Sequence, residues 1–165
     1  EATDIDWFAQ IIKNMGEEKG LQLFRDIVAT NGISVREGHT LLTNLVVSGE
    51  IPLALTVYNY KPEQLKKEGA PIEWYAIEPA IVRPHGVGVA KNAQNPHGAV
   101  LFYDFMISEA QPIMLERDFV PTSKKVDTPL NKIKMQFVEP SVLFEEYDKW
   151  EKLWNEIIIK KSDST

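Results

Sequence analysis

Residues 92–111 read Asn-Ala-Gln-Asn-Pro-His-Gly-Ala-Val-Leu-Phe-Tyr-Asp-Phe-Met-Ile-Ser-Glu-Ala-Gln and hold the clearest local signals in the chain. Asn95 is a typical helix N-cap, and the proline after it suits the first helical turn, where no amide donor is needed. The apolar face of this helix would consist of Phe102, Phe105 and Met106. Ser108 and Gln111 form a second capping pattern, so the segment predicts two helices in immediate succession.

The remainder of the chain alternates between helical and strand-like patterns. Apolar residues at helical spacing predict helices over 4–15, 17–29, 41–48 and 61–68, and a long amphipathic helix that begins at Pro140. Short apolar and β-branched runs predict strands over 33–36, 51–58, 72–77 and 86–90. Residues 119–134 carry turn-forming residues and predict a crossing loop. This alternation favours an α/β fold with a mostly parallel sheet and flanking helices.

Composition limits the class of protein. The 165 residues are 44% hydrophobic, enough for one core or two small lobes. The net charge of −6 and the absence of basic runs argue against nucleic acid as a partner. The chain has no cysteine, which excludes disulfides and thiolate metal sites and leaves the compartment open. The longest apolar run, 51–57, is too short to span a bilayer.

Several short motifs occur in one order along the chain. They are Trp7, Gly49-Glu50-Ile51-Pro52-Leu53-Ala54-Leu55, Tyr58-Asn59-Tyr60, Gly69-Ala70-Pro71, Gly86-Val87-Gly88-Val89-Ala90-Lys91 and the capped segment 95–111. This ordered set resembles the C-terminal half of iron(III)-type periplasmic solute-binding proteins of ABC importers. The resemblance implies part of a two-lobed type II periplasmic-binding-protein-like fold. It implies a second-lobe α/β segment over 1–80, a segment returning to the first lobe over 81–118, and a crossing loop with a C-terminal amphipathic helix over 119–165.

The resemblance also implies a ligand site at Tyr58 and Tyr60. Iron-binding members carry two adjacent tyrosines here, because Fe(III) favours oxygen donors and a phenolate is a strong one. Tyr60 matches the second of these, Asn59 takes the place of the first, and Tyr58 lies one residue earlier. Alternation along an extended chain would put Tyr58 and Tyr60 on the same face. Ferric iron as a metal ligand, an anionic or oxygen-rich organic ligand held by neutral phenols, and plain packing of one tyrosine all stay open.

Other candidate residues surround a predicted helix start. Gly38-His39-Thr40 would expose amide donors at a helix N-terminus, and the corresponding loop touches ligand in the family, although Thr40 could be a simple cap and His39 a surface residue. Trp7 lines the cleft or packs in the core. The turn Arg83-Pro84-His85-Gly86 could bring one cation to the cleft or form only a solvated connection. Structural or solvent roles are expected for the two remaining histidines, His85 and His97.

We expect a binding protein rather than an enzyme, because the chain lacks a nucleophile elbow, a P-loop, an H-E-x-x-H motif and a dinucleotide fingerprint. The principal interpretation is a fragment of a solute-binding component that captures a small solute by hinge closure and serves an ABC permease. An enzyme or a sensory, effector-binding domain on the same scaffold is the alternative. The resemblance implies a periplasmic or otherwise extracytoplasmic, membrane-anchored protein. We also expect apolar surface that favours self-association.

Overall fold

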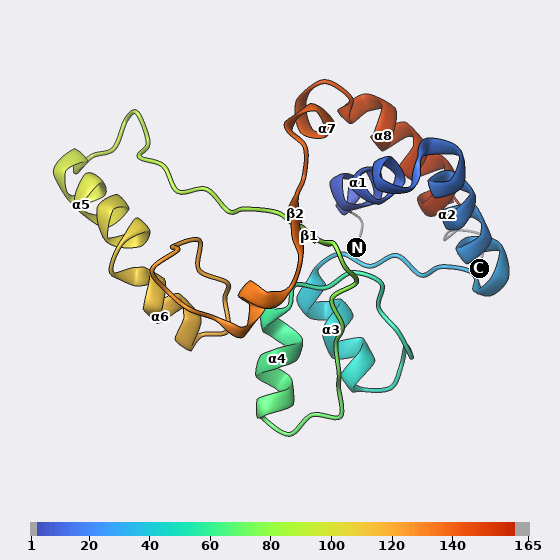
Figure 1. The fold of residues 1–165 in the computed structure, drawn as a ribbon, viewed down its shortest axis with the longest axis horizontal. Coiled ribbons are helices and arrows are strands. Elements are labelled where there is room, and N and C mark those ends of the chain that lie inside the picture. The colour runs from blue at the N-terminus through green and yellow to red at the C-terminus, as the bar shows by residue number, and fades with distance from the viewer. Residues whose placement is uncertain (1–2, 161–165) are drawn as a thin grey trace.

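The computed structural model describes residues 3–160, except for the side chains of Asn31, Pro129 and Asn131. Helices dominate these residues, with two short strands between them (Figure 1). The elements are, in chain order, α1 (Ile5–Met15), α2 (Glu17–Asn31), α3 (His39–Val47), α4 (Tyr60–Lys67), β1 (Ala80–Val82), α5 (Pro96–Ile107), α6 (Ala110–Glu116), the 3₁₀ turn η1 (Pro129–Lys132), β2 (Met135–Phe137), α7 (Pro140–Phe144), α8 (Tyr147–Trp154) and the π-helical turn η2 (Asn155–Ile159).

The hydrophobic core lies between α1, α2, α8 and η2 (Figure 1). The face of α1 that enters it carries four residues at helical spacing, namely Ile5, Phe8, Ala9 and Ile12. Gly20 allows α2 to approach closely, since a Cβ at this position would lie 2.5 Å from the Ile12 Cα. Burial of apolar surface from both ends of the chain therefore holds this helical group together.

The predicted C-terminal helix is interrupted. It is divided into α7, α8 and η2, and Glu146 stands at the first break. The Glu146 carboxylate accepts a hydrogen bond from Trp150 Nε1 at 2.9 Å and one from Lys13 at 3.1 Å. An amphipathic helix from Pro140 onward should bury one apolar face along its whole length. The apolar residues are buried from Trp150 onward, at Trp150, Trp154, Ile157 and Ile158. Before the break the prediction was wrong, because Phe144 is 81% exposed.

A two-stranded parallel ladder, β1 with β2, is the one sheet among residues 3–160. Ala80 pairs with Met135 and Val82 with Phe137. The predicted strands over 33–36, 51–58, 72–77 and 86–90 were wrong, since these segments form no strand. A strand needs a neighbour for its N–H and C=O groups, and within the described residues none lies beside them. A larger type II α/β fold stays a prediction.

The arm formed by α5 and α6 is set apart from the core (Figure 1). Its start was predicted correctly, because Asn95 Oδ1 accepts a hydrogen bond from Gly98 N at 3.2 Å. The predicted second capping box was wrong, because the Ser108 hydroxyl donates to a carbonyl of α5 instead. Gln111 is buried and its Oε1 accepts from Thr122 N at 3.0 Å. This contact fastens the loop that follows α6 to the arm.

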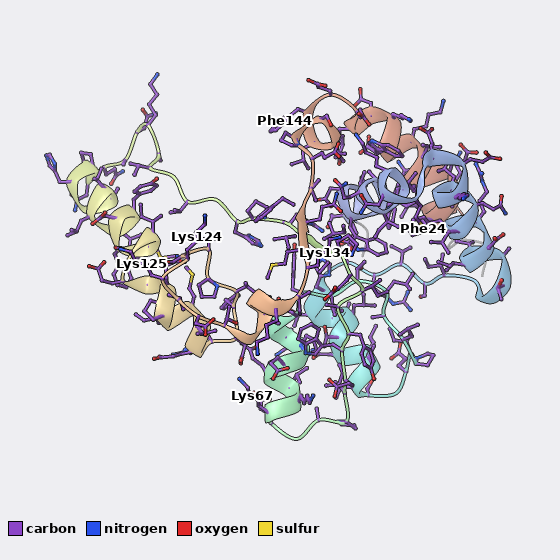
Figure 2. All side chains as sticks on the ribbon, in the orientation of Figure 1. Phe24, Lys67, Lys124, Lys125, Lys134 and Phe144 are labelled. Atoms are coloured by element: carbon purple, nitrogen blue, oxygen red, sulfur yellow. The ribbon has the colours of Figure 1, made fainter. Side chains whose placement is uncertain are left out.

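Two phenylalanines test the position of the core. Figure 2 shows side chains throughout the helical group, with Phe144 at its edge. Phe8 is fully buried and Phe144 is 81% exposed. We expect Phe8→Ala to lower the free energy of unfolding by about 3–5 kcal/mol, and Phe144→Ala by less than about 0.5 kcal/mol. Urea unfolding followed by tryptophan fluorescence measures both. Equal losses would contradict this core.

Candidate functional site

The structure brings Tyr58 and Tyr60 side by side at the start of α4. Their ring centroids lie 6.2 Å apart with the planes at 15°. Tyr60 is the first residue of α4, so the backbone turns into a helix between the two residues rather than staying extended. Tyr60 also packs against Phe119 from the loop after α6, at 4.6 Å between centroids. Two phenol rings thus form one small surface.

Groups from three other segments surround the Tyr58 ring. The His39 ring, on the first turn of α3, lies 4.2 Å from the Tyr58 centroid. His85 approaches with an interplanar angle of 63° at 5.9 Å. The Arg83 guanidinium carbon lies 5.7 Å from the same centroid, in cation–π range. We call Tyr58, Tyr60, His39, Arg83 and His85 the tyrosine cluster.

The buried carboxylate of Asp4 contacts two members of the tyrosine cluster, Arg83 and His39. Asp4 is 1% exposed, and its Oδ1 lies 2.6 Å from an Arg83 guanidinium nitrogen. Its Oδ2 accepts a hydrogen bond from the Thr56 hydroxyl. His39 Nε2 lies 3.3 Å from Asp4 Oδ1, in an orientation too poorly aligned for a hydrogen bond. Arg83 Nε also contacts Asp6 Oδ2 at 3.0 Å. The two aspartates therefore hold Arg83 in place.

Burial and charge act differently on the acidic groups here. Burial disfavours ionised Asp4, but the contacts from His39 and Thr56 outweigh it, so the pKa of Asp4 lies below its ordinary value. Burial raises the pKa of Asp6 in spite of Arg83. Burial likewise raises the pKa of Tyr58, with a smaller opposing effect of Arg83. Tyr58 is therefore a neutral phenol near pH 7.

The other predicted site residues lie in different surroundings. Thr40 is exposed on the first turn of α3, next to His39. Trp7 packs edge-on against Phe24, with centroids 5.7 Å apart, at the rim of the helical core. The structure therefore groups His39 with the tyrosines and places Trp7 with the core. Roles of all five residues in ligand binding stay predictions.

Sequence reasoning missed the carboxylates. Asp4 stands at the start of the helix predicted over 4–15, where a carboxylate usually caps. Its side chain makes no capping hydrogen bond and contacts Arg83 and Thr56 instead. These partners are 79 and 52 residues away, beyond any local pattern. The available signal was Asp-x-Asp at a helix start in a chain whose Arg83 had no local partner. His85 was expected in a structural or solvent role and lies against Tyr58.

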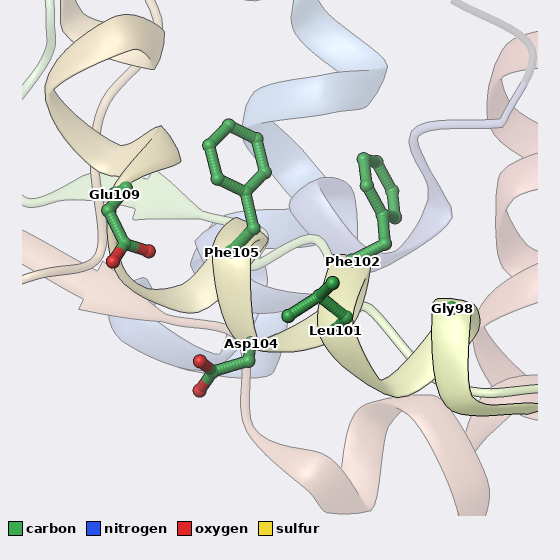
Figure 3. A pocket seen from close by; sticks show the side chains of 6 residues that line it. All are labelled: Gly98, Leu101, Phe102, Asp104, Phe105 and Glu109. Atoms are coloured by element: carbon green, nitrogen blue, oxygen red, sulfur yellow. The ribbon is translucent and has the colours of Figure 1, made fainter.

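An open hollow of the surface lies away from the tyrosine cluster. It is an open depression of about 480 Å³ on α5, lined by Gly98, Leu101, Phe102, Asp104, Phe105 and Glu109 (Figure 3). Its lining combines apolar side chains with two carboxylates and contains no residue of the tyrosine cluster, so we place the chemistry at the cluster. Within residues 3–160, no group of three or more His, Asp or Glu side chains could hold a metal ion. No helix in that part of the chain is both long and apolar enough to cross a membrane.

Comparison with known proteins gives one partial similarity. Over 142 residues the chain is 28% identical to a protein named Iron uptake protein A1 from a strain of Synechocystis sp.. The match covers 79% of this chain and 39% of that protein, so the chain spans about two fifths of the relative's length. No family model matches the chain, and no solved structure matches it. The chain is thus a distant and partial relative of a protein named for iron uptake.

The contacts of Asp4 predict its contribution to stability. We expect Asp4→Asn to lower the free energy of unfolding by about 1–3 kcal/mol near pH 7, because the partners of a buried carboxylate lose their charge-assisted contacts. The exposed Asp148→Asn is the matched control, with an expected loss below about 0.5 kcal/mol. Urea unfolding measures both variants.

The lowered pKa of Asp4 predicts that the stability difference between wild type and Asp4→Asn depends on pH. Because the pKa of Asp4 is lower in the folded chain than in the unfolded chain, ionised Asp4 stabilises the fold above the ordinary carboxyl pKa. That contribution is lost as pH falls through the folded-state pKa. The stability difference between wild type and Asp4→Asn should therefore shrink as pH falls below about 4, the ordinary carboxyl pKa. A difference that grows toward acid would contradict the assignment.

Proposed function

We propose that this chain is part of the solute-binding component of a bacterial ABC importer, which binds a small oxygen-rich solute outside the cytoplasm. The tyrosine cluster carries the proposal. Two stacked phenols with two imidazoles and a guanidinium around them offer hydrogen-bond donors and ring surfaces in one place. The partial similarity to an iron uptake protein supports it independently. Binding, rather than catalysis, is the role we assign.

Ferric iron is the first cargo to consider. Fe(III) is a hard cation that prefers oxygen donors, which Tyr58 and Tyr60 would supply as phenolates. Burial keeps Tyr58 neutral in the free chain, so iron binding would have to release a proton from it. The nearby Arg83 charge favours the phenolate and lowers the cost of that step. Two phenols leave further coordination positions, which other donors would fill.

An organic anion is the second cargo that the cluster suits. Neutral phenols donate hydrogen bonds to carboxylate or phosphonate oxygens, and the rings offer faces for stacking. Arg83 is already paired with Asp4 and Asp6, so its charge is partly neutralised. The phenols and the first turn of α3 would then provide the direct contacts.

The path of the chain supports a hinge. Beyond β1 the chain runs out to the arm, and it returns through β2, which pairs with β1 (Figure 1). The two connections between arm and core therefore pass through one short ladder. Domain closure about a few such residues is the usual way in which two lobes enclose a solute. A membrane permease that receives the solute is the partner we propose.

Tyrosine substitution tests this function. We expect Tyr60→Phe to weaken binding roughly tenfold or more, because one hydrogen bond or ligand bond to a desolvated solute costs about 1–3 kcal/mol. Tyr58→Phe should have an effect of similar size. Tyr147→Phe, on α8, is the matched control and should leave binding unchanged. Calorimetry with ferric citrate, and with citrate alone, measures the affinities and separates iron from organic anion.

Colour provides a second readout of the same experiment. Phenolate bound to Fe(III) gives a charge-transfer band that makes the protein purple. We expect this band with ferric citrate only if iron is the cargo, and its loss when a chelator is added. Affinities for both probes that survive Tyr58→Phe and Tyr60→Phe unchanged would remove the tyrosine cluster from the proposed function.

A further inference from the structure

The turn that ends α6 has an aspartate where glycine is usual. The Asp118 N–H donates to the Leu115 carbonyl at 3.0 Å, and the Phe119 N–H donates to the Met114 carbonyl at 3.1 Å. These two bonds form a Schellman motif, whose residue in the left-handed region is most often glycine. Asp118 occupies that position with a φ of 65°. A side chain there costs backbone strain that glycine avoids, so the aspartate indicates a role for its carboxylate.

Two polar contacts join this turn to α4. Gln64 Nε2 donates a hydrogen bond to the Arg117 carbonyl at 3.0 Å. Lys67 Nζ forms an ion pair with the carboxylate of Asp118, whose side chain is 14% exposed. An ion pair at the surface adds little to the free energy of unfolding, so the main effect of this one is on the orientation of the turn. Glycine at position 118 would form the same turn without this contact.

The last residue of the turn reaches the candidate site. The Phe119 ring packs on the Tyr60 ring, with 4.6 Å between the centroids and 32° between the planes. Tyr60 shares one face of α4 with Gln64 and Lys67, since the three positions follow the spacing i, i+4, i+7. Residues 117–119 therefore contact α4 from its first residue, Tyr60, to its last, Lys67.

We propose that Phe119 is a positioning residue for Tyr60, and that the ion pair between Asp118 and Lys67 keeps Phe119 in place. This role rests on the proposed function, in which the Tyr60 phenol binds the solute. A ring packed at 4.6 Å limits the rotamers open to Tyr60. The phenol then loses less rotational freedom when it meets its solute, which strengthens binding without any contact between Phe119 and the solute. The end of α6 thereby sets the geometry of the site.

Removal of the ion pair tests the anchor. Asp118→Gly keeps the turn and should leave the midpoint of thermal unfolding unchanged or higher. Calorimetry with ferric citrate and with citrate should still show binding weakened by roughly threefold or more, because the turn is no longer held on α4. Lys67→Met should have the same effect, and the double variant should bind no more weakly than either single variant. Lys66→Met is the matched control and should bind as wild type does, since Lys66 pairs with Glu73 instead.

Substitution of the ring tests the positioning itself. Phe119→Leu should weaken binding of the same probes by roughly fivefold or more, and Phe119→Tyr, which keeps an aromatic ring, should restore it. NMR of the free chain with isotope-labelled tyrosine gives an independent readout, in which the Tyr60 signals are assigned by their loss in Tyr60→Phe. The ring-current shifts of Tyr60 should shrink in Phe119→Leu and persist in Phe119→Tyr, because they come from the neighbouring ring.

Tyr60→Phe separates this inference from the proposed function. If Tyr60→Phe weakens binding while Phe119→Leu and Asp118→Gly do not, the positioning role is overturned and the proposed function stands. If Phe119→Leu weakens binding but leaves the Tyr60 spectrum unchanged, Phe119 contacts the solute itself, and the positioning role is again overturned. If wild type binds neither probe, the proposed function fails, and the role of Phe119 in it fails as well.

Discussion

The buried carboxylate of Asp4 is the constraint on which the middle of this structure depends. A carboxylate removed from water needs compensating partners, and the Asp4 side chain makes no capping hydrogen bond to its own helix. Among its partners are Arg83 after β1, the Thr56 hydroxyl before α4 and His39 at the start of α3. Four chain segments therefore meet around a single charge. The ring contacts of Tyr58 follow from it, because His39 and Arg83 are already held there.

Local signals in the sequence predicted the helices well. The Asn95 cap, the apolar spacing of α1 and the glycine between α1 and α2 each act within a few residues, so they could be identified without tertiary information. The strand predictions failed for the opposite reason. The run over 51–58 is apolar and β-branched, yet a strand exists only where a neighbour accepts its backbone groups. Leu53 remains 72% exposed, so the burial that this pattern predicted does not occur here.

In the candidate site too, contacts between residues close in sequence could be predicted and contacts between distant residues could not. Tyr58 and Tyr60 lie two residues apart, so their proximity could be expected from the sequence. The Asp4 to Arg83 pair could not, because the link spans 79 residues and a carboxylate before a helix reads as a cap. Trp7 was ambiguous because aromatic residues serve equally in cores and clefts, and its contact with Phe24 places it at the core. The ion pair between Asp4 and Arg83, which are distant in sequence, was thus the part of the site that local sequence patterns could not predict.

Residues at both ends of the arm, Arg83 before α5 and Phe119 after α6, contact the rings of Tyr58 and Tyr60. Arg83 lies directly after β1, where the chain leaves for α5, and it stands over the Tyr58 ring. Phe119 lies where the chain returns from α6, and it packs on the Tyr60 ring at 4.6 Å. The two phenols therefore each touch one of the two connections between arm and core. A displacement of the arm about the β1–β2 ladder must move at least one of these contacts, so arm position and cluster geometry are mechanically linked.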